Sequence, residues 1–264
     1  MVPIVSTLTQ LHEDFFQQIE QQHGKKLLRN KKVFLKPNIG YPKPAPFTTS
    51  LEVLEQVVET VYEAGAKEII IAEGSTSHSS ALENFKLLGF KEALQNFPIS
   101  FVDLAEEESV AITIRKEVTH FLPTILLEMD YRLSLPVIKF YNDDEGKLFL
   151  SNAVKNFFGL PPKARYKSFE HSYMRDALHK DLHQSVADIY LAVEKFAPFH
   201  LYICDGMKLL KGFAEEGAVE SWGKIIIATN AVEADLKVLE LLQRPPPRFL
   251  GLLKNEKVPN SLSS

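Results

Sequence analysis

The sequence predicts an α/β protein with a mostly parallel sheet flanked by helices. Short apolar runs typical of buried strands alternate with segments of helical periodicity along most of the 264 residues. Several of these runs end in turns rich in Gly, Asn or Ser, and we find no internal repeat. Strands and helices that alternate along a chain favour a parallel sheet with helices packed against it.

The first half of the chain begins with a helix, a strand, a second helix and a second strand. Apolar residues at helical spacing predict a helix over residues 8–28, before a short strand at 33–35. Prolines keep the loop over residues 38–47 extended. Thr49 and Glu52 have the spacing of a capping box, which predicts a helix that ends at about Ala64.

The remaining elements follow from the same patterns. Helices are predicted over residues 79–88, 149–158, 182–196 and 231–242, with a short one before Pro98. Strands are predicted over residues 68–72, 99–104, 110–115, 131–139, 201–204 and 224–229, with an exposed loop over residues 142–147. Residues 1–244 therefore form a single predicted domain, with two lobes (1–115 and 116–244) around a cleft as the alternative. Residues 245–264 contain prolines but no periodicity, so we expect a flexible tail that could bind a protein partner.

Composition excludes several classes of protein. The chain is 45% hydrophobic and 24% charged with a net charge of −4, which does not favour nucleic-acid binding. It has neither a run of about 18 apolar residues nor a secretory signal, so we expect a cytoplasmic protein that does not cross a membrane. Cys204, the only cysteine, excludes internal disulfides and Cys-rich metal sites within one chain. Its apolar surroundings favour a buried core thiol over a catalytic one.

The first candidate site follows the strand at 33–35. Ligands of open α/β sheets bind beyond the carboxyl ends of the strands, where Lys36 and Asn38 are expected. Thr48 and Thr49 begin the next helix, and a helix N-terminus presents free N–H groups to anions. The alternative is a surface lysine followed by an ordinary Pro-Asn turn.

The second candidate is the hydroxyl-rich turn over residues 73–80, which includes Gly74, Ser75 and His78. It follows a strand and precedes a helix, where backbone amides can bind phosphate or carboxylate, although it matches no Walker loop. His78 could act as an acid, a base or a metal ligand. A serine-rich helix start with a solvated histidine is the alternative.

Further candidates lie downstream. Lys139 ends a predicted strand, and Asn156 lies late on a helix that Gly159 closes. Lys155 beside it has a structural explanation, because cations are favourable near a helix C-terminus. Three carboxylates, Asp188, Asp205 and Asp235, complete the set, although an Asp-Gly turn at Asp205 is the alternative there. His179 and His183, four residues apart, give a weak metal-ligand signal.

Short motifs in a fixed order resemble one family. They are KPN at 36–38, TTS at 48–50, EAGAKEIIIAEGS at 63–75, LPVIK at 135–139, KNFFG at 155–159, residues 179–189, CDG at 204–206 and ATNAVEAD at 228–235. The chain resembles the family catalogued as domain of unknown function 362 over residues 30–240. Many members of that family carry a ferredoxin-type iron–sulfur module, whose cluster is held by several cysteines. A chain with one cysteine does not bind such a cluster alone. Residues 36–46 and 74–78 also resemble the N-terminal domain of nickel-dependent lactate racemases at the level of architecture.

The sequence therefore predicts a site for a small anionic ligand that carries phosphate or carboxylate. The predicted catalytic residues are Lys36, Lys139, Asp205 and His78; the predicted ligand-binding residues are Asn38, Thr48, Thr49, Gly74, Ser75, Asn156, Asp188 and Asp235. An isomerase- or transferase-like reaction is one hypothesis. The other is a non-catalytic binding protein, electron-transfer partner or regulatory subunit. A divalent metal and a homo-oligomeric state stay open.

Overall fold

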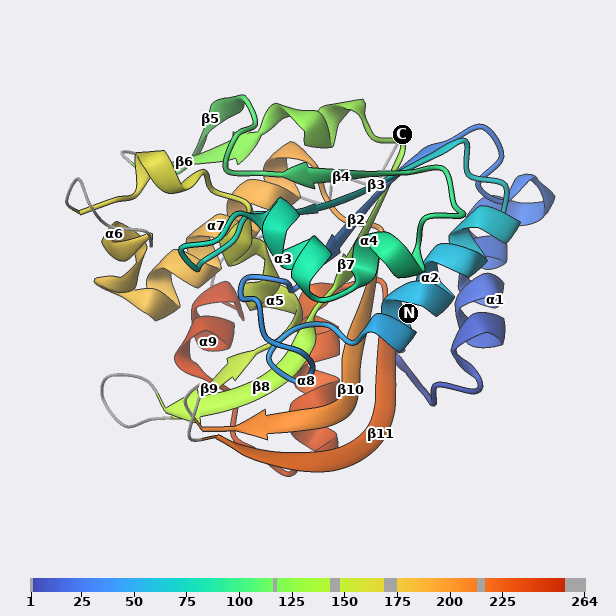
Figure 1. Cartoon of the computed structure of the whole chain (residues 1–264). Coiled ribbons are helices and arrows are strands. Elements are labelled where there is room, and N and C mark those ends of the chain that lie inside the picture. Colours follow the sequence, from blue (N-terminus) through green and yellow to red (C-terminus); the bar gives the residue numbers. More distant parts are fainter. Residues whose placement is uncertain (1, 116–117, 143–147, 169–174, 213–216, 255–264) are drawn as a thin grey trace.

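The computed structural model describes residues 2–115, 118–142, 148–168, 175–212 and 217–254 (Figure 1). Its strands are Ile4–Ser6 (β1), Lys32–Pro37 (β2), Glu68–Glu73 (β3), Ile99–Asp103 (β4), Ser109–Arg115 (β5), Val118–Pro123 (β6), Tyr131–Leu135 (β7), Val137–Asn142 (β8), Leu148–Ser151 (β9), Leu201–Lys211 (β10) and Ala218–Ala228 (β11). Its α-helices are Leu11–His23 (α1), Leu51–Glu63 (α2), Ala81–Leu87 (α3), Phe90–Ala93 (α4), Ala153–Asn156 (α5), Asp176–His179 (α6), Leu182–Phe196 (α7), Ala231–Leu241 (α8) and Arg248–Lys254 (α9). Short 3₁₀ helices cover Gly24–Lys26 (η1), Thr124–Glu128 (η2), Phe157–Gly159 (η3) and Lys163–Arg165 (η4).

One large sheet runs through the protein in the order β1-β11-β10-β7-β2-β3-β4. The strands β4, β3, β2, β7 and β10 pair in parallel, whereas β11 is antiparallel to both β10 and β1. β8 pairs in parallel with the distal part of β10, and β9 forms a hairpin with β8. The predicted α/β fold with a mostly parallel sheet is therefore confirmed. Strands from both halves of the chain share this sheet.

Helices cover both faces of the sheet, so alternate residues of each strand enter different cores. Val33 and Leu35 of β2 pack with α1, α2, α3 and α4, whereas Phe34 packs with α5, α7, α8 and α9. On α2, buried valines and a leucine recur at helical spacing. Burial of each such side chain contributes about 1.5–3 kcal/mol. Among the described residues, no helix is long and apolar enough to cross a bilayer.

Several local predictions were wrong for identifiable reasons. The helix predicted over residues 149–158 is the strand β9 followed by the single turns α5 and η3, because residues 148–151 pair with β8. Pro136 divides the strand predicted over 131–139 into β7 and β8. The helix α2 begins after Ser50, so Thr49 is not its N-cap. The strand predicted over 110–115 is present as β5, which pairs with β6 in a separate two-stranded sheet.

The C-terminal region differs from the predicted tail in its first ten residues. Residues 248–254 form α9, whose Phe249, Leu250 and Leu253 are buried. Arg248 pairs with Asp181 at the start of α7, which fixes α9 against that helix. Residues 255–264 of the predicted tail, like residues 143–147 of the predicted loop, lie outside the described residues. Cys204 is fully buried, and burial raises the pKa of its thiol well above the usual range, in agreement with a core role.

Candidate functional site

The sheet topology defines a crevice at the carboxyl end of β2. From β2 the chain continues outward to β3 and β4, and then returns to place β7 on the opposite side of β2. Ligand crevices of open α/β sheets occur where the strand order reverses in this way. A cavity of about 100 Å³ opens there, lined by Lys36, Asn38, Gly40, Tyr41, Glu73, Gly74, Thr76, Lys139, Ser151, Lys155, Asn156, Phe158, Gly159 and His179. We call this cavity the rim pocket.

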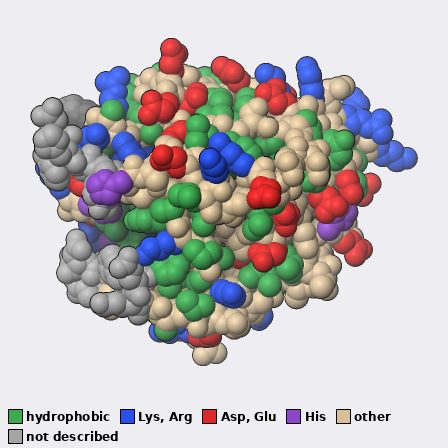
Figure 2. Space-filling view, viewed as in Figure 1, with side chains coloured by type: hydrophobic (Ala, Val, Ile, Leu, Met, Phe, Trp, Pro, Cys, Tyr) green, Lys and Arg blue, Asp and Glu red, His purple; other side chains and the backbone are tan. Residues whose placement is uncertain are grey.

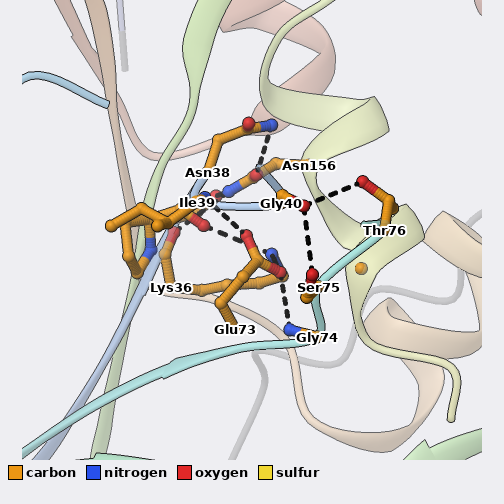
Figure 3. A network of polar contacts seen from close by, with 12 residues as sticks. Lys36, Asn38, Ile39, Gly40, Glu73, Gly74, Ser75, Thr76 and Asn156 are labelled. Carbon is orange, nitrogen blue, oxygen red and sulfur yellow. Dashed lines mark hydrogen bonds and ion pairs between the residues drawn. The ribbon is translucent and has the colours of Figure 1, made fainter. Parts of the chain in front are cut away.

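A buried ion pair connects the ends of β2 and β3 at the rim pocket (Figure 3). Lys36 Nζ lies 2.8 Å from Glu73 Oε1, and the side chains are 0% and 3% exposed. The carboxylate of Glu73 also accepts hydrogen bonds from the backbone N–H groups of Gly74, at 2.8 Å, and Ile39, at 3.0 Å. Burial lowers the pKa of Lys36, and the adjacent carboxylate of Glu73 opposes this shift. Glu73 thus neutralises one of the lysines that line the pocket.

Hydrogen bonds through two side-chain amides connect Lys139, the second lysine of the rim pocket, to the strands β2 and β7. Asn156 Nδ2 donates to the backbone oxygen of Lys36 at 3.0 Å and to Ser134 Oγ at 2.9 Å. Asn156 Oδ1 accepts from Asn38 Nδ2 at 3.5 Å, and Asn38 Oδ1 accepts from Lys139 Nζ at 3.1 Å. Lys139 Nζ also donates to the backbone oxygen of Phe47 at 2.8 Å. These contacts hold the loop after β2 against β8.

Lys155, the third lysine of the rim pocket, lies among aromatic rings. Lys155 Nζ is 5.0 Å from the centroid of the Phe158 ring and 5.9 Å from those of Tyr141 and Phe149. Such cation–π contacts stabilise an ammonium group without satisfying its hydrogen-bond donors. Lys155 Nζ makes no hydrogen bond to any part of the chain that the structure describes. Burial, together with the charges of Arg175 and Lys36, lowers the pKa of Lys155 to about 8.

Burial also lowers the pKa of Lys139 by a large amount. Together with the positive charges of Lys155 and Lys36, it lowers the pKa of Lys139 to about 7, although Glu73 acts in the opposite direction. A lysine with this pKa is present in both protonation states at neutral pH. Strongly shifted pKa values in a cleft are typical of functional sites.

Arg175 supports two walls of the rim pocket from behind. Its side chain is buried, and its Nη2 donates to the backbone oxygens of Gly74, at 3.2 Å, and Gly159, at 2.9 Å. Its Nε donates to the backbone oxygen of Pro161 at 2.5 Å. Burial lowers the pKa of Arg175 to about 10, which leaves it positive at neutral pH. Four cationic side chains therefore surround or support this pocket, and within the part of the chain that the structure describes Glu73 is the one acidic residue that lines it.

The rim pocket contains five of the twelve residues predicted from the sequence: Lys36, Asn38, Gly74, Lys139 and Asn156. Ser75 lies directly behind it, where its hydroxyl donates to the backbone oxygen of Gly40. His78 is exposed and lies outside the lining. Thr48, Thr49 and Asp205 line a separate cavity of about 350 Å³ at the start of α2.

The three predicted aspartates have local partners. Asp205 accepts from the backbone N–H and the hydroxyl of Ser50, both at 2.7 Å, and so caps α2. Asp235 accepts from the backbone N–H groups that start α5, and burial raises its pKa to about 7. Asp188, on α7, forms an ion pair with Arg115 of β5 at 2.6 Å. None of the three lines the rim pocket. Their role in ligand binding stays a prediction.

The residues of the rim pocket that were missing from the predicted set are chiefly Glu73, Lys155, Gly159 and His179. Glu73 ends a buried strand, and the KNFFG motif contains Lys155 and Gly159, so all three positions carried a signal in the sequence. His179 is exposed and packs edge-on against the Phe158 ring at 5.3 Å. Across the described ranges, no three His, Cys, Asp or Glu side chains form a cluster that could hold a metal ion.

Comparison with known proteins identifies the family. The model of the family described as "Domain of unknown function (DUF362)" matches residues 33–240, which include every element that forms the rim pocket. The chain belongs to this family. The expected membership of the family is therefore confirmed. No match was found among curated proteins.

Two solved structures share the fold. One is a protein from Thermotoga maritima, with 13% identity and a TM-score of 0.54 over 94% of this chain and 59% of that one. The other is the lactate racemase apoprotein from Thermoanaerobacterium thermosaccharolyticum, with 14% identity and a TM-score of 0.50 over 90% of this chain and 56% of that one. This DUF362 chain thus spans less than two thirds of either structure. At these identities the likeness concerns the fold alone.

Proposed function

We propose that the rim pocket binds a small ligand that carries a carboxylate or phosphate group. One observation carries this proposal: Lys36, Lys139 and Lys155 line a cavity of about 100 Å³, and Glu73 is the only acidic residue among the described residues of its lining. Because Glu73 pairs with Lys36, no carboxylate in the described lining neutralises the charge of the other two lysines. Inside a partly desolvated cavity, an anion interacts with such charges more strongly than it would in water.

The charge of this pocket is local. On the face seen in Figure 2, lysine and arginine side chains are interspersed with aspartate and glutamate. The net charge of the chain is −4. A broad basic surface of the type that binds nucleic acid is therefore absent from this face, which favours a small anion as the ligand.

The proposal has a catalytic form and a binding-only form. The pKa of about 7 for Lys139 favours the catalytic form, such as an isomerase- or transferase-like reaction, because an acid–base group works best near the ambient pH. In the binding-only form, the same lysine merely holds the loop through Asn38 and Phe47. Chemical modification of Lys139, described below, separates the two forms.

A thermal-shift titration tests the proposal. Phosphate and lactate are suitable probes, the second because one protein of similar fold is a lactate racemase. A ligand that binds only the folded state at 100 times its Kd stabilises that state by about 2.7 kcal/mol. We expect Lys155→Gln to abolish the shift, and Lys208→Gln, an exposed lysine at the separate cavity, to retain it. Equal shifts in the two variants, or none in the unmodified protein, would contradict the proposal.

A further inference from the structure

The hydrogen bonds of Lys139 suit a neutral amine. A neutral lysine amine has two N–H groups and one lone pair, whereas an ammonium group has three N–H groups. Lys139 Nζ has two acceptors, Asn38 Oδ1 at 3.1 Å and the backbone oxygen of Phe47 at 2.8 Å. No third acceptor is found among the described residues. The two acceptors thus satisfy a neutral amine and leave its lone pair without a partner in the pocket that Lys139 lines.

Asn38 is fixed in the orientation that this arrangement requires. Its Nδ2 donates to Asn156 Oδ1, while Asn156 Nδ2 donates to Ser134 Oγ and to the backbone oxygen of Lys36. The amide of Asn38 therefore presents its oxygen, and not its nitrogen, to Lys139. Because Phe47 supplies a backbone oxygen as the second acceptor, the amine is held from two sides.

A separate cation lines the same cavity. Lys155 is held by aromatic rings and makes no hydrogen bond within the described chain, so its N–H groups are available to a carboxylate. The rim pocket thus combines a held amine with a cation that can bind an acid. A volume of about 100 Å³ suits a ligand of a few heavy atoms.

From this geometry, and resting on the anion site proposed above, we infer that Lys139 forms an imine with a small 2-oxo acid whose carboxylate Lys155 binds. The lone pair of Nζ attacks the carbonyl carbon, and one Nζ proton passes to the carbonyl oxygen to give a carbinolamine, whose hydroxyl takes up a second proton from solvent. Loss of water, which removes that oxygen, then forms the C=N bond. The protonated imine keeps one N–H for one of the two acceptors. No oxidant or reductant is needed.

The electrostatic surroundings support this chemistry. Burial and the charges of Lys155 and Lys36 lower the pKa of Lys139, so a substantial fraction of the amine is neutral near pH 7. Lysines made nucleophilic by desolvation and by a neighbouring cation are a known way to activate an amine. Lys36 is unsuited to the same role because it is fully buried and paired with Glu73.

Reductive trapping tests the inference. The protein is incubated with pyruvate and borohydride near neutral pH, and its intact mass and peptides are measured. Reduction of the imine gives a secondary amine, so the mass gain equals that of pyruvic acid less one oxygen atom. We expect one adduct per chain, mapped to Lys139, and suppression of that adduct by lactate, which occupies the site but has no carbonyl group to react. Acetone, which lacks the carboxylate, is expected to react at least ten times more slowly.

Lys139→Arg is the matched variant, because an arginine can donate to Asn38 and Phe47 but does not form this imine. We expect no adduct in Lys139→Arg and an unchanged adduct in Lys208→Arg. The inference is overturned if the unmodified protein gains no adduct, or if the label spreads over surface lysines regardless of lactate. If phosphate still stabilises the protein in that case, the anion site stands and only the imine fails. If no anion stabilises it either, both proposals fail.

Discussion

Lys36 Nζ and Glu73 Oε1 lie 2.8 Å apart where two parallel strands end, and the two side chains are almost completely removed from solvent. The pair connects β2 to β3, and both residues line the rim pocket (Figure 3). A second lysine–glutamate pair, Lys32–Glu68, connects the opposite ends of the same strands at 3.5 Å, with both side chains about 40% exposed. The protein thus contains a buried pair and an exposed pair on the same two strands.

This comparison gives the first prediction. Lys36→Met leaves the buried carboxylate of Glu73 without its cation, which typically destabilises a protein by about 3–5 kcal/mol. Lys32→Met removes the exposed partner and is expected to cost less than about 1 kcal/mol. Chemical denaturation measures both free energies of unfolding. The double variant Lys36→Met with Glu73→Gln should lose less than the sum of the two single losses. Equal losses for Lys36→Met and Lys32→Met would show that the buried pair has no special role.

The second prediction concerns the pH dependence of stability. The pKa of Lys139 is about 7 in the folded protein, below the usual value of about 10.4 expected after unfolding. Between these values the unfolded chain holds a proton that the folded chain lacks, so stability rises with pH. The slope from one such group is at most about 1.4 kcal/mol per pH unit. The stability gained from deprotonation of Lys139 is therefore complete above about pH 10.4, the pKa of lysine in the unfolded chain, and it is lost as the pH falls toward 7.

Lys139→Met removes that contribution, and we expect a shallower rise of the unfolding free energy between about pH 7 and pH 10. Lys155, whose pKa is lowered to about 8, still gives a part of the rise in this variant. Denaturation at several pH values provides the measurement, with Lys208→Met as the control for the loss of an exposed lysine. The same slope in Lys139→Met and in the unmodified protein would mean that Lys139 stays protonated throughout this range.

The third prediction separates a structural from a functional role of Asp205. This carboxylate caps α2 through Ser50 and also accepts from the backbone N–H of Met207 at 3.0 Å. Asp205→Asn turns one acceptor into a donor that faces N–H groups, which is expected to cost about 1–3 kcal/mol. The thermal shift caused by phosphate should persist, because Asp205 lines the other cavity. A variant of normal stability that loses the shift would favour the predicted catalytic role instead.

The parts of the site that sequence predicts are those that follow from strand order. Lys36, Asn38 and Gly74 each end or directly follow a strongly apolar strand, and parallel strands bring their carboxyl ends to one rim. Lys139 was predicted to end a strand, but it reaches the rim pocket from within β8. Asn156 was found through its place before a glycine. The central strands and α2 were predicted for the same reason: their apolar periodicity is strong.

The other elements and site residues could not be predicted, because they depend on contacts between residues that are distant in the sequence. The segment LFLS reads equally well as helix or strand, and its pairing with β8 decides the outcome. The outer half of β11 is exposed and lacks an apolar run, so it was not predicted as a strand, although β10 beside it still buries Leu209 and Leu210. Asp235 looks like a site residue by its position, yet it lies on α8, from which its carboxylate accepts the backbone N–H of Ala153 at the start of α5. Arg175 has no sequence signal, since its partners are backbone oxygens of distant residues.

The last prediction concerns the close approach of Gly159 to the buried ion pair. A Cβ atom at Gly159 would lie 2.4 Å from Glu73 Oε1 and 2.9 Å from Lys36 Nζ, both shorter than any ordinary contact. Neither atom can move into solvent, so Gly159→Ala should displace the pair, at a cost of about 1–3 kcal/mol. Because this displacement also moves Lys36 within the lining, we expect a weaker thermal shift with phosphate.

Gly251→Ala is the matched control, because a Cβ there meets no atom within 4 Å on the exposed side of α9. Alanine has the higher helix propensity, so this variant should be unchanged or more stable by up to about 1 kcal/mol. Its phosphate shift should equal that of the unmodified protein. If Gly159→Ala behaves like Gly251→Ala in both measurements, the ion pair is not confined as the structure implies, and the anion site would not depend on its position.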